Sequence, residues 1–155
     1  MQKITPFLWF DSEAEEAALF YTSTFKDSKM GPIIRYDAAA AKASGRPEGS
    51  VLTVNFELDG MHFVALNGGP MLKFSGAVSF VINCDTQEDI DYYWEKLSAG
   101  GEAGQCGWIS RDKFGLTWQV VPTDLPRLIS NPKGMAAMLK MKKLDIATLE
   151  MANRA

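Results

Sequence analysis

The sequence predicts an α+β fold made of two consecutive βαβββ modules followed by a helical tail. The first observation is a repeat, since each half reads as an apolar strand, a helix with a capping signal, and strands that end in a hairpin. The second is Asp59-Gly60, the dipeptide typical of a two-residue hairpin. The 155 residues, 46% of them hydrophobic, suffice for a single domain with its own core. A ferredoxin-like sheet would have two strands between its helices, and this sequence predicts three.

The first module, residues 1–70, begins with a strand predicted over Ile4–Phe10, nearly all apolar and therefore central in a sheet. Ser12 followed by Glu15 predicts a capping box at the start of a helix. The apolar face of that helix is formed by Ala14, Ala17, Ala18, Tyr21 and Phe25. A short strand over 33–36 leads into AAAAKASGRPEGS, residues 38–50, which is expected to be a mobile loop.

The hairpin around Asp59-Gly60 has a predicted register, because a two-residue turn places Phe56 opposite Phe63 and Val54 opposite Ala65. Side chains alternate between the two faces of a strand. One face therefore carries Leu52, Val54, Phe56, Leu58, Met61, Phe63, Ala65 and Asn67, and the other carries Thr53, Asn55, Glu57, His62, Val64 and Leu66.

The second module, residues 76–122, begins with a strand over 77–84, and Asp85 is expected to cap the following helix. Ile90, Tyr93, Trp94 and Leu97 form the predicted apolar face of this helix, and Gly100-Gly101 ends it. Strands are predicted over 102–105, 108–111 and 116–121. The tail, residues 123–155, is predicted to be helical with breaks at Asn131-Pro132 and Lys133-Gly134.

Composition excludes two kinds of partner. The net charge of −3, with no basic stripe, is unlike that of a nucleic-acid-binding protein. No apolar run reaches the roughly 20 residues that a membrane span needs. The N-terminus does not read as a signal peptide, and Cys84 and Cys106 are therefore expected to be free thiols in the cytoplasm.

Three segments, ITPFLWFDSEAEEAALFYTSTF, LNGGP and CGWISRDKFGLTWQVVP, resemble the PhnB-like branch of the vicinal-oxygen-chelate superfamily. This branch often carries the label 3-demethylubiquinone-9 3-methyltransferase domain. The resemblance extends from Gln2 to about Leu149. It implies a single glyoxalase-like domain over residues 1–155, in which the two modules form a curled mixed sheet around a cavity, and a homodimer.

The methyltransferase label is not supported by the glycines. A nucleoside-type cofactor site uses a glycine-rich turn between a strand and a helix, where backbone N–H groups approach the ligand. The glycines of residues 45–49 and 68–69 lie in expected loops instead. We therefore expect no cofactor.

The resemblance also implies four positions where enzymes of the superfamily place His, Gln or Glu to bind a divalent metal ion. They fall at Pro6, at Ala65 or Asn67, at Ser79 and at Gln119. Proline has no donor atom, serine is a poor ligand, and neutral amides bind weakly without carboxylates beside them. The single histidine, His62, lies on the other face of the hairpin. The expectation is that no metal is bound.

Alternation around these positions predicts a largely apolar cavity wall with a few polar groups, suited to a small organic molecule. The candidate ligand-binding residues are Leu8, Phe56, Phe63, Asn67, Ser79, Trp108 and Gln119. These side chains could equally fill a core. No catalytic residue can be assigned, because Cys106 lacks a neighbouring histidine to activate it.

Three functions stay open at this point. The first is a metal-independent protein that binds a small molecule, or an enzyme of unknown reaction. The second is a metal-dependent lyase, isomerase or dioxygenase with unusual ligands, and the third is a dimeric scaffold. The tail carries more apolar side chains than a peripheral helix pair usually exposes, namely Met135, Met138, Leu139, Leu144, Ile146, Leu149 and Met151. It is expected either to form the dimer contact or to pack on its own sheet.

Overall fold

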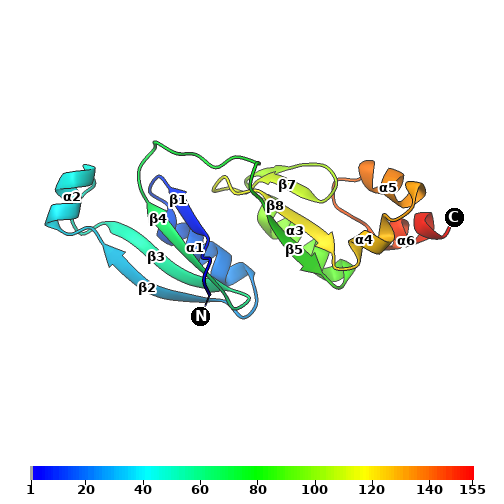
Figure 1. The fold of residues 1–155 in the computed structure, drawn as a ribbon, viewed down its shortest axis with the longest axis horizontal. Coiled ribbons are helices and arrows are strands. Elements are labelled where there is room, and N and C mark those ends of the chain that lie inside the picture. Colours follow the sequence, from blue (N-terminus) through cyan, green and yellow to red (C-terminus); the bar gives the residue numbers. More distant parts are fainter. Residues whose placement is uncertain (1) are drawn as a thin grey trace. The chain divides into compact units, whose positions relative to one another are not determined.

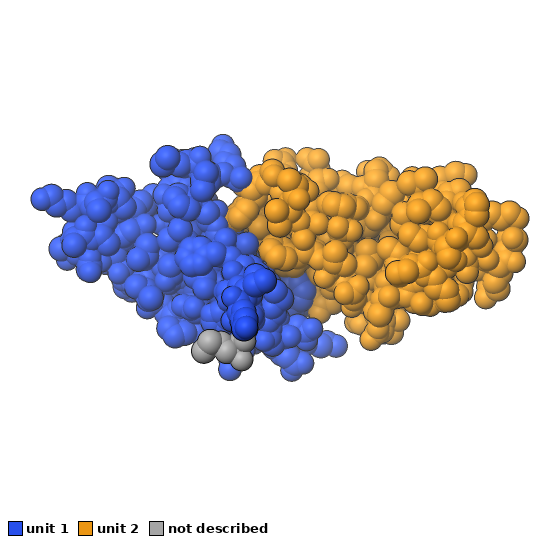
Figure 2. Space-filling model, in the orientation of Figure 1, with its two compact units in different colours: residues 1–73 blue, residues 74–155 orange. Residues whose placement is uncertain are grey.

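The computed structural model describes residues 2–155. These form two compact units that divide after residue 73 (Figure 2). Unit 1 contains β1 (Phe7–Phe10), α1 (Ala14–Thr24), β2 (Lys29–Arg35), α2 (Ala38–Ser44), β3 (Val51–Leu58) and β4 (Met61–Asn67). Its sheet has the order β1-β4-β3-β2, with β1 parallel to β4 and the other neighbours antiparallel (Figure 1).

Unit 2 repeats this arrangement. It contains β5 (Phe80–Cys84), α3 (Gln87–Ser98), β6 (Glu102–Ala103), β7 (Trp108–Arg111) and β8 (Trp118–Pro122), and its sheet has the order β5-β8-β7-β6. The first strand is again parallel to the last, and the remaining neighbours are antiparallel. Two mixed four-stranded sheets with the same order confirm the predicted pair of βαβββ modules.

The hairpin register is confirmed, since Phe56 lies opposite Phe63 and Val54 opposite Ala65. Asp59 and Gly60 both have positive φ values, 50° and 77°, as a type I′ turn requires. Residues 38–44 are helical, so the prediction of a loop there was wrong. Asp37 accepts a hydrogen bond from the Ala40 N–H, and Gly45 ends α2 with a φ of 73°.

The helix starts differ from the predicted caps at two further places. The N-cap of α3 is Thr86, whose side chain accepts a hydrogen bond from the Asp89 N–H. Asp85, the predicted cap, instead accepts a hydrogen bond from the Thr123 hydroxyl. At α1 the N-cap residue Glu13 makes no side-chain capping bond, so the predicted Ser12 capping box does not form.

The tail is part of unit 2 and forms α4 (Leu125–Leu128), α5 (Pro132–Leu139) and α6 (Ile146–Arg154). Asn131-Pro132 starts α5, with the Asn131 side chain as its cap. The predicted break at Asn131-Pro132 is therefore present between α4 and α5, but α5 runs through Lys133-Gly134, and the second break lies between Leu139 and Ile146. Leu128, Leu144 and Leu149 pack with Val121 of β8 in one buried cluster. Packing of the tail on its own sheet, one of the two expected arrangements, is what the structure shows.

Polar contacts also attach the tail. The side-chain amide of Gln87 in α3 donates a hydrogen bond to the Leu144 carbonyl, and its oxygen accepts one from the Ile146 N–H. Lys143 forms an ion pair with Asp91 at 2.8 Å, and the hydrogen bonds from Lys143 and Gln87 lower the pKa of the Asp91 carboxyl. Within residues 2–155, no helix is both long and apolar enough to cross a membrane.

Candidate functional site

Three predicted site residues of unit 1 lie on the sheet face that α1 covers. Leu8, Phe56 and Phe63 are 7%, 1% and 4% exposed. The rings of Phe56 and Phe63 stack with centroids 5.4 Å apart, and Phe56 also stacks on Tyr21 of α1 at 6.4 Å. These three side chains fill the core of the unit, which is the alternative that the sequence left open for them. Alternation determines which residues share a face of the sheet. The face expected to line the cavity was inferred from the implied ligand positions. It is the face that α1 covers.

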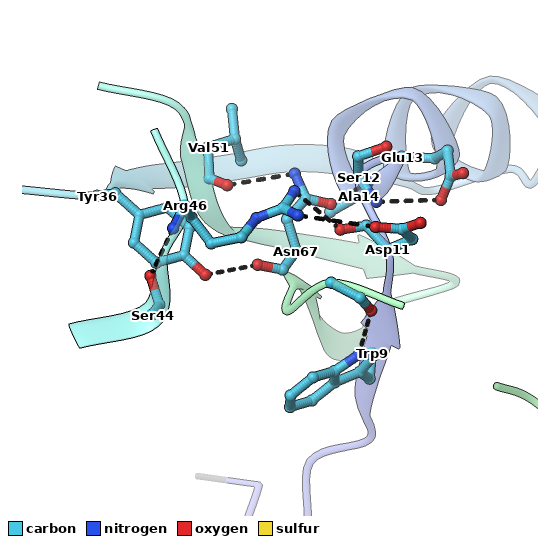
Figure 3. A network of polar contacts seen from close by, with 11 residues as sticks. Trp9, Asp11, Ser12, Glu13, Ala14, Tyr36, Ser44, Arg46, Val51 and Asn67 are labelled. Atoms are coloured by element: carbon cyan, nitrogen blue, oxygen red, sulfur yellow. Dashed lines mark hydrogen bonds and ion pairs between the residues drawn. The ribbon is translucent and has the colours of Figure 1, made fainter. Parts of the chain in front are cut away.

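Asn67, the fourth predicted site residue of unit 1, organises a polar network at the end of β4 (Figure 3). Its Oδ1 accepts the Ala14 N–H at 2.8 Å, and its Nδ2 donates to the Val51 carbonyl at 3.2 Å. The Tyr36 hydroxyl donates to the Asn67 carbonyl at 2.6 Å. Asn67 therefore caps α1 from a distant strand, in place of the capping box predicted from Ser12.

Replacing Asn67 with alanine is expected to lower the free energy of unfolding by about 2–3 kcal/mol, because two backbone groups lose their partners near a residue that is 6% exposed. Urea denaturation measures this change. Asn67→Asp is the comparison variant, since it keeps the acceptor for the Ala14 N–H but brings a carboxylate oxygen against the Val51 carbonyl, so its loss of stability reports on the contact with Val51. An alanine variant as stable as the wild type would show that the network contributes nothing.

The three predicted site residues of unit 2 lie together on one face of their sheet. Gln119 of β8 is directly opposite Val81 of β5 on one side and Trp108 of β7 on the other. The Gln119 Nε2 donates a hydrogen bond to the Ser79 Oγ at 3.0 Å. Val81 is 49% exposed and Trp108 is 36% exposed. We call Ser79, Val81, Trp108 and Gln119 the helix-free face of unit 2, because the buried row with Ile109 and Trp118 faces α3.

This face offers a defined pair of hydrogen-bonding groups beside an aromatic ring. Because Ser79 Oγ already accepts from Gln119, its hydroxyl hydrogen is available as a donor, and Gln119 Oε1 is available as an acceptor. The indole of Trp108 and the side chain of Val81 add apolar surface on either side of Gln119. The arrangement suits a planar molecule that carries a neutral group able both to donate and to accept.

Unit 1 has a corresponding face, whose residues are not among the predicted site residues. We call it the helix-free face of unit 1, and it consists of Phe7, Trp9, Thr53, Asn55, Glu57, His62, Val64 and Leu66. All except the exposed Phe7 are half-buried. The alternation in the hairpin could have identified this face. The opposite face, with Phe56 and Phe63, is more apolar, and a helix is expected to cover the more apolar face of a sheet.

The residues at the implied metal positions do not fit a divalent ion. Asn67 uses its side chain to cap α1, and Ser79 and Gln119 bond to each other. Residues 2–155 contain no group of three or more His, Cys, Asp or Glu side chains placed to hold a metal ion. A proline, two neutral amides and a hydroxyl are a poor donor set for the metals that this fold usually binds.

Both cysteines are free thiols, and Cys84 is not built as a nucleophile. Burial, together with the nearby carboxylates of Asp89 and Asp85, raises the pKa of the Cys84 thiol to about 12. At neutral pH Cys84 is therefore a protonated packing residue. Cys106 is half-buried in a turn, where its N–H donates to the Met141 carbonyl.

A hollow of about 450 Å³ lies in unit 2, lined by Cys84, Asp85, Pro122, Thr123, Asp124, Leu128, Ile146 and Glu150. Its polar groups are bonded to the protein itself. Arg127 pairs with both Asp124 and Glu150, and these bonds raise the pKa of the guanidinium. Thr123 donates to Asp85. The hollow therefore has few groups left to recognise a ligand.

Comparison with solved structures agrees with this architecture. The chain is 34% identical to a PhnB protein from Bacillus cereus that carries the label 3-demethylubiquinone-9 3-methyltransferase, with a TM-score of 0.69 over 78% of this chain and 99% of that one. Protein PA1353 from Pseudomonas aeruginosa shares the fold at 18% identity, with a TM-score of 0.59 over 77% of this chain and 96% of that one. No curated protein matches the chain.

The model of the 3-demethylubiquinone-9 3-methyltransferase family matches residues 2–121, the two βαβββ modules. The family name does not describe a cofactor site in this chain. The turns from β1 to α1 and from β5 to α3, residues 11–13 and 85–86, contain no glycine. With the family match, the fold and the PhnB relative in agreement, the chain belongs to the 3-demethylubiquinone-9 3-methyltransferase (PhnB-like) family.

Proposed function

We propose that this protein binds a small organic molecule without a metal ion, on the helix-free face of unit 2. The observation that carries the proposal is the Gln119–Ser79 hydrogen bond beside the exposed ring of Trp108. The bond orients both side chains, so that one donor and one acceptor are presented together. The expected ligand has a planar aromatic body and a neutral amide-like group, whose oxygen accepts from Ser79 and whose N–H donates to Gln119.

Charge supports a neutral ligand over an anion. The four residues of this face carry no charge, so a carboxylate or phosphate would lose its hydration without gaining a cationic partner. The ring of Trp108 supplies a stacking surface that is independent of ligand charge. The binding energy then comes from apolar contact, and the hydrogen bonds supply orientation.

Benzamide is the probe that tests this function, because it combines a phenyl ring with one amide. Binding to the purified protein is measured by calorimetric or NMR titration in the presence of EDTA. Gln119→Ala is expected to weaken binding about three- to tenfold, since one hydrogen bond contributes roughly 0.5–1.5 kcal/mol. Ser130→Ala, an exposed serine between α4 and α5 and outside the sheet, is the control and is expected to bind as the wild type does.

Metal content is measured on the same preparation. We expect substoichiometric Zn, Ni, Fe and Mn, and no loss of thermal stability on treatment with EDTA. Roughly one metal ion per chain, removed by the chelator with loss of stability, would support a metal-dependent enzyme and contradict the proposal.

We also propose that the protein is a cytoplasmic homodimer. Three large apolar side chains of the tail are exposed, Met135 at 37%, Leu139 at 60% and Met151 at 67%. A second copy would cover such side chains, and methionine adapts well to a shared surface. Light scattering at micromolar concentration is expected to give twice the mass of one chain. A mass of one chain that persists as the concentration rises would rule out the dimer.

A further inference from the structure

We propose that His62 forms a second recognition site, on the helix-free face of unit 1, and that its Nδ1 accepts a hydrogen bond from the hydroxyl of a neutral phenol-like molecule. This site lies in the other unit and does not depend on Ser79, Trp108 or Gln119. His62 is the only histidine in the chain.

The position of the ring proton follows from the contacts of Asn55. The Asn55 Nδ2 donates to the Pro32 carbonyl at 3.3 Å, which directs the Asn55 Oδ1 towards His62. That oxygen lies 3.0 Å from His62 Nε2 and can only accept. The neutral imidazole therefore carries its proton on Nε2, and Nδ1 is the acceptor.

The backbone of His62 is held as well. Its N–H donates to the Gln2 side-chain oxygen at 3.0 Å, and its carbonyl accepts from the Gln2 amide at 3.0 Å. The ring thus projects from a fixed strand and is oriented by Asn55. Nδ1 is therefore an acceptor in a fixed direction, which a donor on a ligand can meet without reordering the ring.

Apolar surface lies next to this acceptor. Val64 is two residues from His62 on the same face, about 7 Å along β4. Phe7 of β1 is paired with Val64, and Trp9 is paired with Leu66 in the next row. Phe7 is 58% exposed. An aromatic ring lying on Phe7 and Val64 would place a substituent near His62.

The neighbouring charges select the kind of substituent. Glu57 is directly opposite His62 on β3 and would repel an anion. Lys29 forms an ion pair with Glu57 at 3.6 Å, so an organic cation would have to displace it. A neutral hydroxyl donor meets neither penalty. These contacts therefore favour a phenol over a carboxylate or an amine.

The test compares p-cresol with toluene, which has the same ring and methyl group but no hydroxyl. The protein is labelled with ¹⁵N in histidine. Both ring nitrogen signals then belong to His62, and no assignment is needed. Spectra are recorded at a pH at which titration shows the ring to be neutral. The free protein is expected to show its proton on Nε2. Addition of p-cresol should shift the Nδ1 signal, and addition of toluene should not.

Variants distinguish recognition of the p-cresol hydroxyl by His62 from apolar contact with the aromatic ring of the probe. In the wild type p-cresol should bind about three- to tenfold more tightly than toluene, the range expected for one hydrogen bond. His62→Phe keeps an aromatic ring and should abolish this preference while toluene still binds. Asn55→Leu should reduce the preference. Thr53→Val, on the same face but in the row of Leu66 rather than that of His62, should preserve it.

Three results would overturn the proposal: a ring proton on Nδ1 in the free protein, equal affinity for the two probes in the wild type, or no binding of either probe near β4. Because the benzamide site lies in unit 2, each of these results leaves the proposed function standing. Conversely, loss of benzamide binding in Gln119→Ala leaves the His62 site untouched.

Discussion

Replacing Asp112 with alanine is expected to lower the free energy of unfolding by about 3–5 kcal/mol. Asp112 is 2% exposed, in the turn between β7 and β8. Its Oδ1 accepts the N–H groups of Phe114 at 2.8 Å and Leu116 at 3.0 Å, and its Oδ2 accepts the indole N–H of Trp118 at 2.8 Å. Alanine would leave three donors without this acceptor in the core of unit 2.

Two further variants locate the origin of this loss. Asp112→Asn keeps one acceptor but places an amide N–H₂ against the indole N–H, so it is expected to cost about 2 kcal/mol. Trp118→Phe removes the opposing donor. The double variant Asp112→Asn/Trp118→Phe should therefore lose less stability than the sum of the losses in its two single variants. Guanidinium denaturation measures the free energy of unfolding of the two single variants and the double variant. An alanine variant within 1 kcal/mol of the wild type would contradict this account of the turn.

Replacing Leu144 with alanine is expected to destabilise the protein by about 2–5 kcal/mol, through lost transfer energy and the cavity that remains. Leu144 is fully buried in the cluster that joins the tail to β8. Leu139→Ala is the matched control, because it deletes the same atoms from a residue of the same tail that is 60% exposed. Its expected cost is below about 0.5 kcal/mol.

Thermal denaturation of the two leucine variants decides whether the tail belongs to the core of unit 2. If both variants melt at the same temperature, Leu144 does not anchor the tail. Light scattering on Leu139→Ala also bears on the proposed homodimer, since an exposed tail contact would be weakened by this variant without a change in fold.

Much of the fold could be predicted because it depends on residues that are close in sequence. Asp59-Gly60 determines the hairpin register, since few dipeptides accept two positive φ values in succession. The spacing of Ala14, Ala17, Ala18 and Tyr21 identifies the buried face of α1, and all four are fully buried. The strand–helix–strands order of each half follows from the same local signals.

The parts that could not be predicted depend on contacts between distant segments. Asn67 caps α1 across more than 50 positions of sequence, and no local motif announces such a cap. Helix α2 could have been predicted from its five alanines and from Asp37 and Gly45 at its two ends, and it was missed because the glycines and the proline that follow are typical of a loop. Strand alternation is symmetric, so by itself it does not tell which face of the first sheet a helix covers. Only the greater apolarity of the face with Phe56 and Phe63 indicated that α1 would cover it.

The most direct test of metal-free binding on a helix-free face is an amide-resolved NMR titration of the protein with benzamide in EDTA. The account predicts shifts at residues 79–81, Trp108 and Gln119, and little change at Phe56 and Phe63. Shifts confined to the α1-covered face, or binding that appears only when Zn²⁺ or Mn²⁺ replaces EDTA, would contradict it.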